Sequence, residues 1–344
     1  MSGPGGAPAT GSGTDRAGPA RSGPVHAYRV YGGRLVSDVE LSGLPEDEGD
    51  EDGRGRAADW TLRRIPGPPP GDDAELLASQ ELMADVELRL LRAGEDLRLA
   101  FDDTGTFDVS ADGSRIDWRP GPRVTADHLR SDVAGRVLPL ALHRRGVVTL
   151  HASAARIGDG AVAFAGPKGA GKTTAAYGLG ALGATVLADD AVPVEPGEPP
   201  RISPGLHRLR LRSDVARATG HGPDAEVTED GRVEAEPTPP PRTGRPVPLR
   251  AVYLLSPVEE GAGPAVRRER LEGRRAALAL LGQVKLGTLL ARWRGGDLVR
   301  ICSGLAEQVP VYRLEVARDL DRLEETARFV ADAHGGPGPA GTAG

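Results

Sequence analysis

The chain has 344 residues, a formal net charge of −6 and a pI near 5.7. This balance, without a basic face or stripe, argues against a broad nucleic-acid interface. The single cysteine, Cys302, excludes an internal disulfide and a cysteine-rich zinc site, and we expect it to be a small core residue in a reducing compartment. No run of about 18 apolar residues occurs, and the N-terminus has no apolar signal segment, so we expect a cytoplasmic protein without a membrane partner.

Basic residues are used unevenly along the chain. Only three of the 43 lysines and arginines are lysine, namely Lys168, Lys172 and Lys285. With 48 glycines and 30 prolines this pattern indicates a coding bias, and most arginines are expected on a solvated surface. Two of the three lysines lie in one glycine-rich stretch, GPKGAGKTT, which therefore needs a chemical explanation.

The first third of the chain predicts a tail followed by a β-rich domain. Residues 1–24 are glycine, alanine, proline, serine and threonine with little to bury, which indicates a disordered tail. Residues 25–124 contain short alternating apolar runs broken by Gly, Asp-Gly and Pro, which predict a β-meander and a smaller, mainly-β N-terminal domain. Its tyrosines and tryptophans are expected mostly in the core, and an exposed strand edge there could accept a peptide as an added strand.

The remaining segments predict an α/β domain at residues 125–333. A helix is expected after Thr125 as N-cap, then strands at 147–157 and 161–166, a helix at 173–182 and a strand at 185–190. A strand, helix and strand within about thirty residues form the unit of an α/β sheet. Further strands at 249–257 and 309–317, with helices around them, extend this domain. Residues 334–344 are expected to form a second flexible tail.

The stretch GPKGAGKTT fits the pattern G-x-x-x-x-G-K-[ST] at Gly166, Gly171, Lys172 and Thr173. Glycines let the backbone wrap a phosphate, the following helix start attracts it, lysine reaches the outer phosphates and the hydroxyl binds magnesium. The stretch follows a predicted strand and opens a predicted helix, which is the context that the motif requires. Lys168 has no fixed part in the motif and either adds charge opposite a triphosphate or lies in solvent. The candidate cofactor-binding residues are Gly166, Pro167, Lys168, Gly169, Ala170, Gly171, Lys172, Thr173 and Thr174.

Two acids and a histidine are the other candidate site residues. Asp189 and Asp190 end the strand after the phosphate-loop helix, and such a pair can divide metal binding from proton acceptance. Without the loop, a turn with one capping acid would be the better interpretation. His151 ends an apolar run beside the strand that leads into the loop, so we expect its imidazole near the phosphates or the acid pair.

The order of histidine, hairpin, phosphate loop and Asp-Asp pair in residues 151–194 resembles the catalytic core of HPr kinase/phosphorylase and its shorter relatives. This resemblance implies a phosphoenolpyruvate-carboxykinase-like P-loop domain with a mixed sheet, and ATP- and Mg²⁺-dependent phosphorylation of a serine hydroxyl. It also implies that Lys172 and Thr173 bind phosphates and Mg²⁺, that Asp189 is the base, that Asp190 is a metal ligand and that His151 tunes the base.

Two departures from that family shape the expected substrate. Lys168 stands where the HPr kinases have serine, and the segment at residues 202–216 lacks their catalytic-glutamate signature. These departures argue against a reverse phosphorylase activity, whose existence the sequence leaves open. We expect an acceptor other than HPr, preferably a serine-containing peptide or protein such as a lasso-peptide precursor. A small-molecule kinase and a non-catalytic nucleotide-binding module remain alternatives. The sequence leaves open the choice between ATP and GTP, and whether the chain forms a homo-oligomer.

Overall fold

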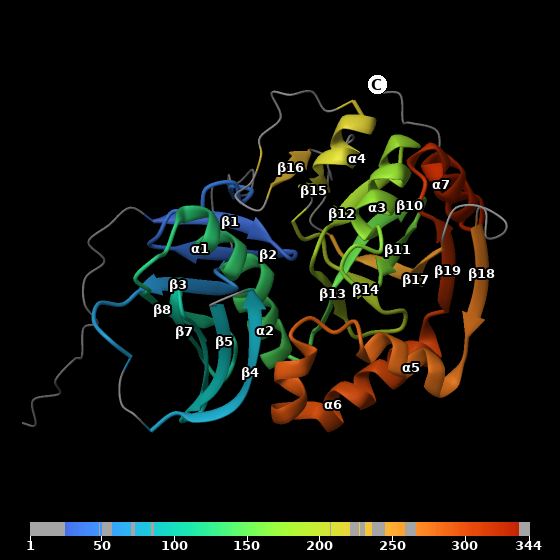
Figure 1. Ribbon diagram of the computed structural model, residues 1–344. Coiled ribbons are helices and arrows are strands. Elements are labelled where there is room, and N and C mark those ends of the chain that lie inside the picture. The colour runs from blue at the N-terminus through green and yellow to red at the C-terminus, as the bar shows by residue number, and fades with distance from the viewer. Residues whose placement is uncertain are drawn as a thin grey trace, which may run out of the picture.

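The computed structural model describes residues 25–47, 49, 57–69, 73–83, 86–206, 208–220, 227, 231–235, 245–258 and 266–336. The tail predicted at residues 1–24 lies outside the described residues, and so does the tail predicted at 334–344 beyond residue 336. Among the helices of the described residues, none is both long and apolar enough to cross a membrane. The fold is mixed α/β, with two large sheets and helices around the second (Figure 1).

The first sheet has eight strands in the order β1-β2-β3-β8-β7-β6-β5-β4. Strands β4 to β8 are antiparallel neighbours as a meander predicts, but β3 lies between β2 and β8 and is parallel to both. Parallel neighbours need a crossover connection, so the sheet is more than a meander. Its strands are β1 (His26–Val30), β2 (Gly33–Ser37), β3 (Trp60–Arg64), β4 (Glu75–Met83), β5 (Val86–Ala93), β6 (Asp96–Phe101), β7 (Gly105–Val109) and β8 (Arg115–Pro120).

Alternation along these strands sends apolar side chains to one face. Leu88 and Leu90 of β5, and Leu97 and Leu99 of β6, are buried in a single hydrophobic cluster. The same cluster includes buried residues of the helical segment that follows: α1 (Ala126–Asp132), a π-helical turn at Val133–Val137 and α2 (Leu138–Arg144). The Thr125 hydroxyl accepts a hydrogen bond from the His128 N–H at 3.1 Å, which confirms the predicted N-cap.

The second sheet has nine strands and is mixed. Its order is β12-β10-β11-β17-β14-β13-β9, with β19 beside β17 and β18 beside β19. Strands β11, β17 and β19 are parallel and the other pairs are antiparallel. The strands are β9 (Val148–Leu150), β10 (Ala152–Ile157), β11 (Gly160–Ala165), β12 (Thr185–Ala188), β13 (Val192–Glu195), β14 (Arg201–Ile202), β17 (Val247–Val258), β18 (Val266–Leu271) and β19 (Val311–Ala317).

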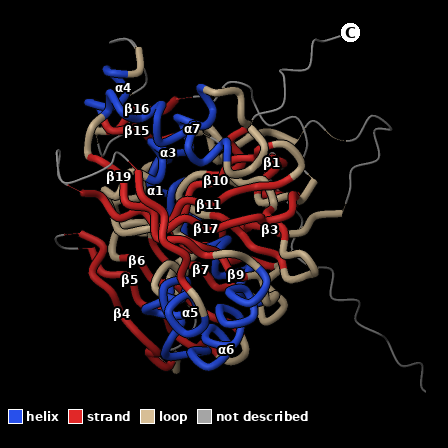
Figure 2. The backbone as a smooth tube through the Cα atoms, turned by 90° about the vertical axis from the view of Figure 1, so that its right-hand side faces the viewer, coloured by secondary structure: helices blue, strands red, loops and turns tan. Residues whose placement is uncertain are grey.

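Helices cover both faces of this sheet. Figure 2 shows α3 (Lys172–Ala181) and α7 (Leu323–Asp332) on one side of β10, β11 and β17, and α5 (Gly273–Leu281) and α6 (Gly287–Gln308) on the other. Accordingly β11 is buried throughout: Ala161, Ala163 and Ala165 join the cluster with α5 and α6, whereas Val162 and Phe164 join the cluster with α3 and α7. Cys302 of α6 is fully buried, as expected for a core residue. A hairpin of β15 (Leu209–Arg212) and β16 (Arg232–Ala235), with α4 (Ser213–Ala218), lies beside α3.

The strand directions bring the sequence motifs to one edge of the sheet. Strand β12 is antiparallel to β10, which is antiparallel to β11, so β11 and β12 run in the same direction with β10 between them. The loop after β11 and the acids after β12 therefore leave the sheet at the same edge. The strand predicted at 147–157 is broken at His151, because β9 pairs with β13 whereas β10 pairs with β11 and β12.

Candidate active site

The loop between β11 and α3 has the backbone of an anion cradle. Gly169 and Gly171 adopt left-handed φ angles of 83° and 95°, and a Cβ on either would meet nothing within 4 Å. Gly171 is the N-cap residue of α3, and in the described part of the chain no side chain caps this helix start. The loop and the uncapped, positive end of α3 line the cavity described below, an arrangement that suits a phosphate.

Lys172 and Thr173, the first two residues of α3, carry the side chains of the motif. The Lys172 Nζ is buried and donates to the carbonyl oxygens of Gly166 and Pro167, at 3.0 and 3.2 Å. Burial lowers the pKa of Lys172, and the charges of the two acids after β12 oppose this shift. Thr173 Oγ1 lies 3.0 and 3.3 Å from the two carboxylate oxygens of Asp189.

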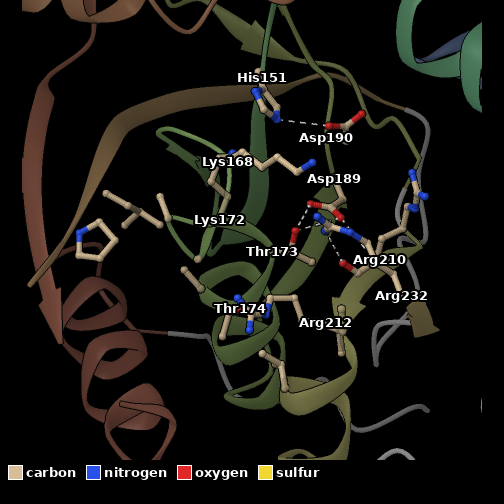
Figure 3. A pocket seen from close by; sticks show the side chains of 18 of the residues that line it. His151, Lys168, Lys172, Thr173, Thr174, Asp189, Asp190, Arg210, Arg212 and Arg232 are labelled. Atoms are coloured by element: carbon tan, nitrogen blue, oxygen red, sulfur yellow. Dashed lines mark hydrogen bonds and ion pairs between the residues drawn. The ribbon is translucent and has the colours of Figure 1, made fainter. Parts of the chain in front are cut away.

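Asp189 is buried and held by hydrogen bonds from three elements. Besides Thr173, it accepts from Ser153 Oγ at 2.5 Å and from the Arg210 N–H at 3.2 Å. Burial raises the pKa of Asp189, the Ser153 hydroxyl lowers it, and the charge of Asp190 raises it further. Figure 3 shows its carboxylate directed toward Thr173.

Asp190 has the opposite surroundings, although it is the next residue. Its φ of 66° is left-handed, and its half-exposed carboxylate lies 2.7 Å from Lys285 Nζ and 3.4 Å from His151 Nε2 (Figure 3 shows the contact with His151). Burial acts to raise the pKa of Asp190, but Lys285 and His151 together hold it well below its ordinary value. The pKa values of these two neighbouring acids are therefore shifted in opposite directions.

These groups line one cavity of ≈ 840 Å³. All three lysines of the chain, Lys168, Lys172 and Lys285, contribute to its wall, and Figure 3 shows the Lys168 side chain extending toward the acid pair. The β15–β16 hairpin adds arginines, and strand β4 of the first sheet closes another side. Lysines and arginines outnumber the acids on this wall and, apart from Lys285, which is paired with Asp190, they suit a polyanionic ligand. The arginines on this wall are Arg136, Arg210, Arg212, Arg232 and Arg318.

A smaller cavity of ≈ 220 Å³ reaches the same acids from the side of the first sheet. It shares Asp189, Asp190 and Arg210 with the larger one and is also lined by Tyr31. Gly135, in the π-helical turn, lies beside it, and a Cβ there would come 3.6 Å from Asp190 Oδ2. Single π turns are often found at functional sites. The acid pair can thus be approached from two directions.

The structure brings His151, Lys172, Thr173, Asp189 and Asp190 to this one site, together with residues 168–171 and Thr174 of the loop. Gly166 and Pro167 lie beneath the loop, where their carbonyl oxygens accept from Lys172. The contacts pair Thr173 with Asp189 and His151 with Asp190, and the division of base and metal ligand between the two acids stays a prediction.

Sequence reasoning alone does not single out Lys285 or the arginines of the hairpin. A signal for each was present. Lys285 is the third lysine in a chain that otherwise uses arginine, and Arg208, Arg210 and Arg212 alternate at the period of a strand, which places them on one face.

The described residues contain no group of three or more His, Cys, Asp or Glu side chains suited to hold a metal ion. Mg²⁺ usually binds through one or two carboxylates together with substrate phosphates rather than in an all-protein cage. The Thr173 hydroxyl and the two acids fit that kind of shared site and would not fit a site made of protein ligands alone.

Comparisons with known proteins give a distant structural similarity. No family model and no curated protein matches the chain. Among solved structures, the HPr(Ser) kinase/phosphatase from Coxiella burnetii aligns with 55% of this chain and 99% of its own, at 14% identity and a TM-score of 0.26. A likeness at that level carries no argument about activity, so the function is argued below from the geometry of the site.

Proposed function

We propose that this protein is a Mg²⁺-dependent ATP kinase that transfers a phosphoryl group to a hydroxyl acceptor. The observation that carries the proposal is the contact of Thr173, the last motif residue of the phosphate loop, with Asp189, next to Asp190 in the same cation-lined cavity. Phosphoryl transfer needs little covalent chemistry from the protein and depends on positioning and charge neutralisation. A phosphate loop, an array of cations and two acids supply both.

ATP and Mg²⁺ fit the residues present. The open space above Gly169 and Gly171, and the uncapped start of α3, would hold the β- and γ-phosphates with the Lys172 ammonium. Thr173 and Asp189 would hold Mg²⁺, which when bound neutralises charge on the phosphate oxygens. The cavity is also lined by Leu255, Pro257 and Leu320, apolar side chains suited to contact a nucleobase.

The contacts favour one division of work between the acids. Asp189, buried against the Thr173 hydroxyl, is placed to ligate the metal. Asp190, half exposed and beside His151, is placed by its position in the cavity to accept the proton of an acceptor hydroxyl. This reverses the roles that the family resemblance implies for the pair.

For the acceptor we propose a serine of a peptide or protein, such as a ribosomal peptide precursor. The second cavity supports this, because it opens to the acids from the side of the β-rich first sheet.

For the nucleotide-binding part we propose a phosphoenolpyruvate-carboxykinase-like P-loop domain, supported by the strand, loop and helix around Lys172.

Incubation of the protein with labelled ATP, Mg²⁺ and candidate precursor peptides tests the proposal. We expect label in the peptide with the wild-type protein. Lys172→Met should lose nucleotide binding, whereas Asp190→Asn should keep it and lower transfer by about 10²–10⁴-fold, the usual contribution of a general base. Asp189→Asn should weaken Mg²⁺-dependent nucleotide binding.

Two results would redirect the proposal. Label appearing in a metabolite fraction of cell extract, and in no peptide, would identify a small-molecule kinase. Tight nucleotide binding that survives both Asp variants, with no turnover in any extract, would identify a regulatory module.

A further inference from the structure

The turn that joins α5 to α6, residues 282–286, is fixed to the candidate site by its backbone. The Gln283 carbonyl oxygen accepts from the His151 N–H at 2.7 Å, and the Lys285 N–H donates to the Thr149 carbonyl at 2.8 Å. Between these bonds Val284 forms a bridge with Leu150. The turn therefore continues the end of β9 and holds the backbone of His151 in place.

The same turn is also tied to the phosphate loop. The side-chain Oε1 of Gln283 accepts from the Gly166 N–H at 2.9 Å, across 117 residues of sequence. Gly166 is the first residue of the motif. Gln283 thus contacts both the start of the phosphate loop, at Gly166, and the histidine of the site, at His151. It links these two parts of the site through its own hydrogen bonds.

Lys285 extends this turn to the acid pair. Its side chain is 14% exposed, and its Nζ lies 2.7 Å from Asp190 Oδ2 and 3.3 Å from the Asp190 carbonyl oxygen. The ammonium therefore contacts both the carboxylate and the backbone of one residue. That double contact fixes the peptide that carries the carboxylate as well as the carboxylate itself.

Backbone strain is found at both ends of this ion pair. Among the described residues, the non-glycine positions with left-handed φ are Tyr31, Asp190 and Leu286. Asp190 (66°) is one partner of the pair and Leu286 (59°) directly follows the other. Asp tolerates this region, but for leucine it is a true outlier. Such conformations persist where the surrounding structure enforces them, and they gather at functional sites.

The composition of the chain gives an independent reason to single out Lys285. A protein in which only three of 43 basic residues are lysine has all three on the wall of one cavity. Lysine offers a compact charge with three rotatable donors, whereas arginine offers a rigid planar fork. An ammonium suits a position that must donate to a carboxylate and a carbonyl of the same residue.

We propose that Lys285 is a positioning residue for phosphoryl transfer: it holds the Asp190 carboxylate beside His151, and the Gln283 contact keeps that assembly in register with the phosphate loop. The inference rests on the proposed function, because it assigns Lys285 to the step in which the acceptor hydroxyl loses its proton. It predicts that Lys285 acts on turnover and leaves nucleotide binding to the loop.

The test compares Lys285→Met and Lys285→Arg with the wild type, using ATP hydrolysis as the probe of phosphoryl transfer to water. Arg292→Met is the matched control, because it removes an exposed cation from the same helix pair. Each protein is assayed for kcat, for the Kd of Mg·ATP and for the melting temperature. Misplacement of a reacting group can cost about 10²-fold in rate, and we expect kcat of Lys285→Met to fall by about that factor with Kd unchanged.

The remaining outcomes are also decisive. Lys285→Arg keeps the charge and loses the compact geometry, so its kcat should lie between those of the Met variant and the wild type, and Arg292→Met should match the wild type. Unchanged kcat in Lys285→Met would overturn the inference. A parallel loss of kcat, nucleotide affinity and melting temperature in both Lys285 variants would assign the residue a structural role instead, and would also overturn it. Failure of the wild type to bind Mg·ATP would instead refute the proposed function.

Discussion

Asp189 and Asp190 show how one backbone angle separates two chemically identical neighbours. An extended chain would place their side chains on opposite faces of a strand, but both are needed at the same edge of the sheet. The left-handed φ of Asp190 turns its carboxylate toward His151 and Lys285, while Asp189 stays buried against Ser153 and Thr173. Their pKa values shift in opposite directions as a result.

His143, at the end of α2, gives a prediction about stability and pH. It is buried, and its Nε2 has no hydrogen-bond partner among the described residues. Burial lowers the pKa of His143 from 6.5 to about 4, and a hydrogen bond with the Lys285 backbone opposes this shift. Between these two pH values the His143 imidazole is protonated in the unfolded chain and neutral in the folded chain. The stabilisation is complete above pH 6.5 and is lost as the pH falls through about 4.

The pKa difference corresponds to about 3 kcal/mol of unfolding free energy, an order-of-magnitude figure. We expect urea denaturation of the wild type to show stability declining from pH 6.5 toward pH 4, with a shallower decline in His143→Gln. Equal slopes in the two proteins would contradict the prediction.

At the scale of single elements, the start of α1 gives a quantitative prediction. Thr125 is exposed, and its hydroxyl satisfies one N–H of the first turn, at His128. Thr125→Ala should lower the free energy of unfolding by about 1 kcal/mol, whereas Thr125→Ser should keep most of it. Chemical denaturation of the three proteins measures this. An alanine variant as stable as the serine variant would show that the cap contributes nothing.

Strand β4 shows where reading elements from sequence fails. Its sequence, ELLASQELM, consists largely of residues with high helix propensity and lacks an alternating pattern, so the alternation that predicts the β-meander does not extend to it. In the structure it pairs with β5 along its length, with irregular register at both ends. Strand pairing reflects neighbours more than intrinsic preference, so tertiary context decides such a segment. Helix α3, in contrast, begins and ends within a residue of its predicted position.

At the scale of the whole molecule, one hydrophobic cluster joins the two sheets. It includes Trp60 and Trp118 of the first sheet, buried residues of α1 and α2, and one face of the second sheet with α5 and α6. Trp293 of α6 packs against the same cluster, and the Arg144 guanidinium of α2 lies over its ring. The division at residue 124 stays a prediction about domains, but the core continues across it.

This shared core predicts cooperative unfolding. Tryptophan fluorescence reports mainly on the first sheet, which contains Trp60 and Trp118, and far-ultraviolet circular dichroism reports on the helices, most of which pack on the second sheet. We expect both signals to change at the same urea concentration, since neither sheet can lose its inner face alone. Two separated transitions would show that the halves unfold independently.

The sequence by itself determined the phosphate loop, the helix that follows it, the N-cap at Thr125 and the residues expected at the site. These features depend on local rules, since glycine conformation, capping and periodicity act over a few residues. Only the tertiary structure shows the contacts of Thr173 with Asp189 and of His151 with Asp190. It also shows the contact of Lys285 with Asp190, 95 residues away in the sequence. Such contacts depend on strand order and register between distant segments, and on the left-handed turn at Asp190. The spacing of residues along the chain predicts neither the order and register of distant strands nor the left-handed conformation of Asp190.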